Sequence, residues 1–568
     1  MKLVVGARRV LLVGLVCVAL FAPAAARAAE PVVLGSASVQ NLTALIAKAA
    51  KLADKFVPGT GVQVQGMSAM LTQAPEWAGV DWAKPATVVL FGGKAFGKPD
   101  PVPVVILAVA DAAQFKNAHP AGGPVQFEIR GNLAVIAENP AGLAAITPQR
   151  LELYSAFPKL AASADLYVTA YVSAAVAEYQ AEIDQGIKEL EMDAAGLGPA
   201  GPMAMIGKIT KTLGPLTNLA GKQLRRASLT LQLNDESVEM SGRFYSEPDS
   251  ELGTFLAGQP AQGTDLAKFL PADVVMSVAG KLDIEKAKPL VDAVLKAIAA
   301  PLEMKPEDQE KLRSLMFAST QTGEFAMGMA GDPAHQGIQS IQVVRIADAA
   351  KFRAASKDAV EWFSQSGFGA MLQGMGMQMT LDYKPNAREY KGVPIGRFTV
   401  TMAQAPGAEP NPMMGQAPPQ ITDLAAIDTL GIATSGNTEG DLINALIDRI
   451  QGGGGGGLDA AASYQAVVKA APQGTNVITT ISFNSMLAKF VEQVAKQQPA
   501  IGLMVGGLIK ADPTETPIAC TTQFSGDHVD FTTRIPHQPI LALVTRIRLM
   551  IQQQQRPVPG PQPKGAEF

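Results

Sequence analysis

The sequence predicts an α+β protein with two tandem copies of a mixed, largely antiparallel sheet, and with helices packed on one face of each sheet. Three observations lead to this prediction. Short alternating strands recur in hairpin-like pairs, helices separate those pairs, and one order of elements occurs twice along the chain. The 568 residues are 47% hydrophobic and 17% charged, which is the composition of a folded protein with sizeable cores and not of a disordered one.

The N-terminus has the pattern of a secretory signal. Basic residues (Lys2 and Arg8) precede a short apolar run, and an A-x-A cleavage site ends at Ala28. We therefore expect residues 1–28 to be removed and the mature chain to be exported, to the periplasm or outside the cell. A retained anchor fits less well, because the run is shorter than the ~20 residues of a spanning helix. No later stretch is long and apolar enough, so no transmembrane segment is expected in the mature chain.

Removal of this signal changes the charge and the cysteine content. It takes away four of the 47 basic residues and none of the 51 acidic ones, so the net charge falls from −4 to −8. A mildly acidic chain is not expected to bind nucleic acid, which requires a basic face. Cys520 becomes the only cysteine, which excludes an intramolecular disulfide, and we interpret it as a buried, inert thiol.

A short motif marks the repeat. The pattern Ala-Asp-Ala-Ala-x-Phe occurs at 110–115 and again at 347–352, each time after an apolar strand. Four further pairs of segments follow the same order around it. They are a strand-then-helix unit from Pro31 and from Asp273, a strand opening a short helix at 133–146 and 430–447, a strand running into a helix at 164–179 and 475–490, and a hairpin at 227–244 and 519–535. We therefore predict an internal duplication, with copy A at 29–258 and copy B at 259–551.

Copy B differs from copy A mainly by two insertions. Residues 403–420 are rich in proline and polar residues, and residues 451–457 contain six consecutive glycines. Neither can bury enough apolar surface to offset the cost of ordering its backbone, so both are predicted to be flexible and dispensable for folding. The Pro/Gln-rich residues 552–568 are predicted to form a disordered tail.

Few motifs in the sequence point to chemistry. Residues 92–98 (GGKAFGK) fit a phosphate-binding loop, but Pro99 stands where that loop needs Ser or Thr, so a hairpin turn is the better interpretation. His528 lies between Asp527 and Asp530, where we expect a solvated turn.

Sulfur and aromatic residues allow two further interpretations. Met375, Met377 and Met379 would share one face of a strand and could offer soft ligands to Cu(I), although ordinary core packing is favoured because no His or Cys supports them. Trp77 and Trp82 are expected to pack a loop onto the sheet.

The second copy carries a resemblance to a known group of proteins. Leu270-Pro271-Ala272-Asp273 opens a strand, and it is followed by GIATSGNTEGDLINAL (431–446) and SYQAVVKAAPQGTNVITTISFNSML (463–487). This succession resembles exported bacterial proteins of an uncharacterised domain-of-unknown-function family. The resemblance implies an exported, repeated α+β domain, and it implies no activity, cofactor or catalytic residue.

The sequence shows no catalytic, cofactor-binding or metal-binding constellation. We therefore expect an exported, non-enzymatic protein with a binding or envelope-structural role, and no cofactor. The alternative is a carrier of a small apolar or lipid ligand, held in a cleft between helices and sheet. The partner would be an unidentified protein in the first case and a small apolar ligand in the second. An enzyme ranks third, because residues far apart in sequence can still converge in space.

Overall fold

The computed structural model describes residues 31–120, 125–196, 202–302, 304–318, 322–332, 337–365, 377–404, 419–436, 441–497 and 515–554. The predicted signal (1–28), most of the predicted insertion at 403–420 and residues 555–568 of the predicted tail lie outside these ranges. The first three tail residues belong to the last helix, which ends at Gln554.

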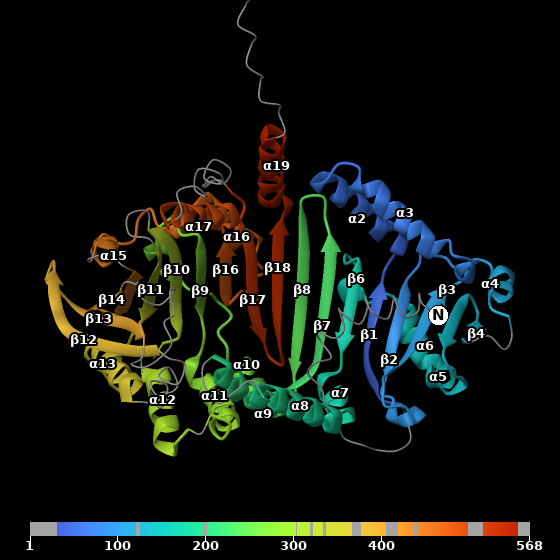
Figure 1. Ribbon diagram of the computed structural model, residues 1–568, viewed down its shortest axis with the longest axis horizontal. Helices are drawn as coiled ribbons and strands as arrows, with labels where there is room; N and C mark the ends of the chain where they lie inside the picture. Colours follow the sequence, from blue (N-terminus) through green and yellow to red (C-terminus); the bar gives the residue numbers. More distant parts are fainter. Residues whose placement is uncertain are drawn as a thin grey trace, which may run out of the picture.

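One open antiparallel sheet of 18 strands runs through the described part of the chain (Figure 1). From one edge to the other the strands are β4 (Gln126–Arg130), β5 (Leu133–Ala137), β3 (Val102–Ala108), β2 (Ala86–Phe91), β1 (Val33–Val39), β6 (Leu166–Ala170), β7 (Leu224–Leu233), β8 (Ser237–Ser246), β18 (His528–Pro536), β17 (Ile518–Ser525), β16 (Val477–Ile481), β9 (Met276–Lys281), β10 (Glu324–Asp332), β11 (Gly337–Arg345), β15 (Leu430–Gly436), β14 (Gln420–Ile427), β13 (Val393–Gln404) and β12 (Met377–Tyr390). Mixed helix and sheet, with a large antiparallel sheet, is therefore confirmed.

The two halves of the chain meet at the centre of this sheet. Strand β8 closes the first half and β18 closes the second, and they pair along their length from Ser237 opposite Pro536 to Tyr245 opposite His528. Figure 1 shows them side by side in the middle of the molecule. The pairing joins segments almost 300 residues apart, so the two halves share a single sheet.

Helices surround this sheet on both sides of its centre (Figure 1). They are α2 (Leu42–Phe56), α3 (Thr60–Thr72), α4 (Ala112–Ala118), α5 (Pro140–Ala145), α6 (Pro148–Ser155), α7 (Val172–Glu178), α8 (Gln180–Gly196), α9 (Pro202–Gln223), α10 (Glu251–Ala257), α11 (Ile284–Ala299), α12 (Pro306–Ala318), α13 (Ala349–Gln365), α15 (Asp441–Gln451), α16 (Ala462–Ala470), α17 (Phe483–Gln497) and α19 (His537–Gln554).

The repeated motif has the same local role at both positions. The Asp111 carboxylate accepts the N–H groups of two residues at the start of α4, at 2.9 and 3.0 Å. The Asp348 carboxylate does the same at the start of α13, at 2.8 and 3.0 Å. Each aspartate is an N-cap, and the phenylalanine four residues later (Phe115 or Phe352) is buried. The motif therefore starts a helix and anchors it to the sheet.

At β3, toward one edge of the sheet, helices cover both faces. The prediction that helices pack on one face only is therefore wrong for this part of the sheet. On β3, Val104 and Ile106 belong to a buried cluster with Tyr154 of α6. Leu107, on the opposite face, belongs to a second cluster with Phe115 of α4. Strands buried on both faces need a nearly continuous apolar run, and VPVVILA of β3 is such a run.

The glycine-rich segment 451–457, predicted to be flexible, instead forms a series of hydrogen-bonded turns. The Gly454 N–H donates to the Arg449 carbonyl at 2.8 Å, and Arg449 donates to the Gly456 carbonyl at 3.1 Å. Gly453, Gly454 and Gly456 have positive φ angles, which other residues rarely adopt. Glycine at 453, 454 and 456 therefore suits a compact turn, which ends where Gly457 packs against the backbone of Lys268.

Two neighbouring glycines in this turn provide a test. A Cβ at Gly457 would overlap the backbone carbonyl of Lys268, whereas a Cβ at Gly455 would meet nothing within 4 Å. We expect Gly457→Ala to lower the free energy of unfolding by about 1–3 kcal/mol, and Gly455→Ala to change it by less than about 0.5 kcal/mol. Urea denaturation measures both, and equal stability of the two variants would contradict the turn described here.

The central pairing provides a second test. Gly242 on β8 lies beneath the ring of Phe531 on β18, and a Cβ at residue 242 would overlap that ring. We expect Gly242→Val to destabilise the protein by about 1–3 kcal/mol, because Phe531 also stacks on Phe244 and cannot move freely. Gly66→Ala on exposed α3 is the control, since nothing lies within 4 Å of that site. Urea denaturation measures both variants, and a Gly242→Val protein as stable as the control would contradict this packing.

Candidate functional site

The six central strands differ from the rest of the sheet because both of their faces are largely half-buried. The buried clusters of the described residues lie mainly in the outer parts of the sheet. Residues directly opposite each other on antiparallel strands share a face, so the register identifies which side chains lie together. Two continuous rows cross β6, β7, β8, β18, β17 and β16 on one face.

This face is called the central apolar face, and it is mostly aliphatic and aromatic. The first row is Leu166, Leu231, Met240, Thr533, Cys520 and Thr479, and the second is Val168, Leu229, Gly242, Phe531, Thr522 and Val477. All of these side chains except that of Gly242 are half-buried. Cys520, expected to be fully buried, is one of them.

Aromatic packing fixes the middle of the central apolar face. The rings of Phe244 and Phe531 are stacked, with centroids 5.6 Å apart and planes inclined by 20°. Phe531 also covers Gly242, which has no side chain to compete for that space. The ring therefore spans the junction of β8 and β18, where it reinforces the pairing of the two halves.

Helices cover one end of this same face. Val172 and Val176 of α7 form a buried cluster with Ala227 of β7. Phe255 of α10 meets Phe524 of β17 edge-on, with centroids 5.5 Å apart. The half-buried part of the central apolar face is thus bounded on this side by helices.

The opposite face of the same strands carries a charged cluster. Arg243 of β8 makes two hydrogen bonds to Asp530 of β18, at 2.5 and 2.8 Å, and the hydrogen bond to Asp530 raises the pKa of the Arg243 guanidinium. Arg226 stacks over the Tyr245 ring at 4.0 Å. Ser241 and Thr532 share a hydrogen bond of 3.0 Å in the next pair of opposite residues. This cluster links the two halves by polar contacts.

His528 lies at the end of the charged cluster and is more enclosed than a solvated turn residue. Its Nδ1 is 2.8 Å from Asp527, and its Nε2 is 3.5 Å from Asp530. The hydrogen bond from His528 lowers the pKa of the Asp527 carboxyl. Both ring nitrogens therefore face carboxylates. His528, Asp527 and Asp530 could be grouped from the sequence because they are close together in the chain. Arg243 could not, because its partner Asp530 lies 287 residues away.

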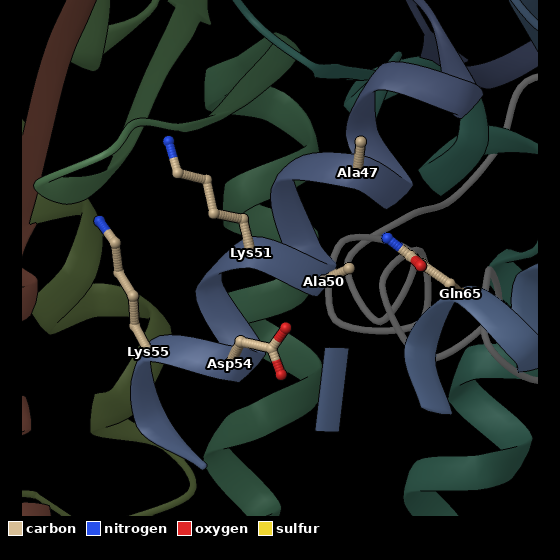
Figure 2. Close-up of a pocket in the computed structure, with 6 residues that line it drawn as sticks. All are labelled: Ala47, Ala50, Lys51, Asp54, Lys55 and Gln65. Atoms are coloured by element: carbon tan, nitrogen blue, oxygen red, sulfur yellow. The ribbon is translucent and has the colours of Figure 1, made fainter. Parts of the chain in front are cut away.

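A shallow hollow of about 480 Å³ lies between α2 and α3 (Figure 2). Its charged side chains bind neighbouring groups of the protein. Asp54 accepts the Gly61 N–H at 2.7 Å, and Lys51 pairs with Asp235 at 2.6 Å. Figure 2 shows Lys51 and Lys55 pointing away from Gln65 on the other side of the hollow. The hollow is therefore a gap in helix packing, and it lacks convergent polar groups.

The hairpin and tryptophan interpretations are confirmed. Residues 92–98 connect the antiparallel strands β2 and β3, and Lys94 is held by the carbonyl of Glu178. Trp77 and Trp82 are edge-on to each other at 5.7 Å and pack against a buried cluster of the sheet.

The structure describes two of the three methionines that could have offered ligands to Cu(I). Met375 lies outside the described residues, and strand β12 begins at Met377, with Met379 opposite Met402. Within the described ranges, no group of three or more His, Cys, Asp or Glu residues is arranged to hold a metal ion.

None of the described helices combines the length and apolar character needed to cross a bilayer.

Comparison with protein-family models, with curated proteins and with solved structures finds no match to this chain.

The charged cluster can be tested by a double-mutant cycle. We expect Arg243→Leu and Asp530→Leu to show a coupling of about 1 kcal/mol in the free energy of unfolding, because the pair is bidentate and partly shielded from water. The exposed pair Lys305 and Glu307, 3.8 Å apart, is the control and should show no measurable coupling. Additive effects at Arg243 and Asp530 would show that the cluster does not tie the halves together.

Proposed function

We propose that this protein is an exported, non-enzymatic binding protein whose contact surface is the central apolar face. The observation that carries the proposal is the pair of half-buried rows across six strands. Those rows span roughly 24 Å, taking about 4.8 Å for each of five strand spacings. These mostly apolar side chains are left half-buried and not enclosed in a core. A surface of this kind and breadth suits contact with an apolar partner. A protein with a flat apolar surface is therefore the favoured partner.

A carrier of a small apolar or lipid ligand is the second candidate. It is favoured by the helices α7 and α10, which bound one end of the same face and so limit the space for a large partner. The flexible side chain of Met240 and the ring of Phe531 would suit an acyl chain. Both candidates use the same residues, so one experiment can distinguish them.

The arrangement of polar groups favours binding over catalysis. Arg243, Asp530 and His528 satisfy one another across the junction of β8 and β18. A catalytic group must instead reach a substrate and hold a proton or a lone pair for it. Export is inferred from the N-terminal pattern of residues 1–28. Cleavage after residue 28 would also remove Cys17, the other cysteine of the sequence, and leave Cys520 as the single thiol. Membership of the exported domain-of-unknown-function family remains a prediction.

We also propose that the sheet arose by internal duplication. Read outward from the centre, β8, β7, β6, β1, β2, β3 and β5 follow the same order of connections as β18, β17, β16, β9, β10, β11 and β15. The residue before β6, Asp165, accepts the N–H of Leu233 at 2.8 Å. The residue before β16, Asn476, accepts the N–H of Phe524 at 2.8 Å. These matched buried groups support a common origin for the two halves.

Cys520 provides a test of the binding surface. An environment-sensitive fluorophore on this thiol would report directly from the central apolar face. We expect oleate, or an envelope protein fraction, to shift its emission, because binding removes water from the surrounding side chains. The control is Gln523→Cys in a Cys520→Ser background, since residue 523 lies on the opposite face of the same strand.

The outcomes separate the two candidates. A response to oleate alone identifies a carrier, and a response to the protein fraction alone identifies a protein partner. An absent response to both, an equal response at residue 523, or resistance of native Cys520 to labelling would overturn the proposal.

A further inference from the structure

A buried histidine lies where strand β18 passes into helix α19. His537, the first residue of α19, is 3% exposed. Its backbone N–H donates to the Glu236 carbonyl at 2.8 Å, and its ring Nδ1 is 3.3 Å from the Asp235 carbonyl. Among the described residues, the ring Nε2 has no hydrogen-bond partner. Buried polar atoms without a partner are rare in folded proteins, so this nitrogen needs a physical explanation.

Three parts of the chain meet at His537. Its ring lies edge-on to Phe56 at the end of α2, with centroids 6.1 Å apart. The Arg548 guanidinium of α19 donates to the Phe56 carbonyl. Asp235 lies in the turn between β7 and β8. Figure 1 shows α19 continuing from the end of β18, with α2 beside it. His537 therefore joins the last helix to the first half of the chain.

The surroundings of His537 disfavour a positive charge on its ring. Burial lowers the pKa of His537, and the positive charge of Lys55 on α2 lowers it further, while the carbonyl and the carboxylate of Asp235 act in the opposite direction. The Asp235 carboxylate is already paired with Lys51 at 2.6 Å, and Lys55 donates to the Asp235 carbonyl. Arg548 is a further cation beside Phe56. The ring is therefore neutral where it packs against α2.

Acid acts on this contact in a definite direction. A histidine in water titrates near pH 6.5, whereas the buried His537 binds a proton at a lower pH. Below about pH 6.5, the exposed ring therefore takes up a proton that the buried ring does not. Separation of α19 from α2 is favoured by up to about tenfold for each pH unit in this range. Asp235 does not titrate there, because the hydrogen bond from Lys51 lowers the pKa of its carboxyl.

We propose that His537 is an acid-sensitive latch, which holds α19 on α2 at neutral pH and releases it when the ring is protonated. The release is local. The junction of β8 and β18 keeps its own contacts, the packing of Phe531 on Gly242 and the pair of Arg243 with Asp530. The inference does not depend on the function proposed for the central apolar face.

His119 provides a comparison within the same chain. Its ring stacks on Phe115 with centroids 4.4 Å apart, and its Nδ1 is 3.0 Å from the Phe115 carbonyl. Its side chain is half-buried, unlike that of His537. The two histidines thus share an aromatic neighbour and a carbonyl partner, but they differ in enclosure. A substitution at His119 is therefore a matched control.

Hydrogen exchange followed by mass spectrometry tests the latch in the full mature chain between about pH 7.5 and pH 5. We expect the protection of the α19 amides, corrected for intrinsic exchange, to fall by up to about tenfold per pH unit below about pH 6.5. His537→Phe and His537→Leu keep an apolar group against Phe56 and cannot bind a proton, so this fall should disappear in both. The readout is the slope of protection against pH, so a variant that is less protected at every pH still tests the latch.

His119→Gln should keep the slope of the unmodified protein at α19. Helix α13, in the other half of the chain, is the internal reference, and its protection should not follow the state of His537. Constant protection of α19 below about pH 6.5 would overturn the proposal, as would an unchanged slope in the two His537 variants. A parallel loss of protection at α13 would also overturn it, because acid would then unfold the whole protein and not release one helix.

Discussion

The antiparallel pairing of β8 with β18 is the contact on which the architecture depends. It joins two halves that would otherwise each expose the unpaired edge of a sheet. Both faces of the junction contribute. Phe531 covers Gly242 and stacks on Phe244 on one side, while Arg243 binds Asp530 on the other. Apolar packing and a charge-assisted bond thus specify the same register, and a shift by one residue would lose both.

The same pairing explains why a broad apolar surface exists at the centre. The outer strands are buried by helices on both faces, so their side chains are committed to cores. At the junction, the helices that follow β18 and precede β7 lie toward the ends of the strands, as Figure 1 shows for α19 and α9. The middle of six strands is therefore left with half-buried Leu229, Leu231 and Phe531. The architecture creates this surface, and the proposed function assigns it a role.

The sequence predicted elements that depend on local pattern. The hairpins and the packing of Trp77 follow from residues close together in the chain. The repeated pattern at 110–115 and 347–352 was also visible, although its role as a helix start with Asp111 or Asp348 as the N-cap came from the structure. Other features depend on distant partners or on backbone geometry and could not be found in this way. Arg243 and Asp530 have no local sign of their pairing, and the glycines of 451–457 look flexible by composition because the nearby Lys268 backbone is not visible in a sequence. The continuous apolar run of β3 was a signal for two covered faces.

The position of β18 near the end of the chain also determines when the sheet can be completed. Strand β8 is synthesised after 246 residues, but its partner begins only at His528. During that interval the inner edge of the first half has no native partner, and contacts of such large sequence separation form slowly. Charged residues on β8, such as Glu239 and Arg243, make that open edge less able to pair with a foreign strand. Completion of the fold is therefore a late event, which must follow synthesis of nearly the whole polypeptide.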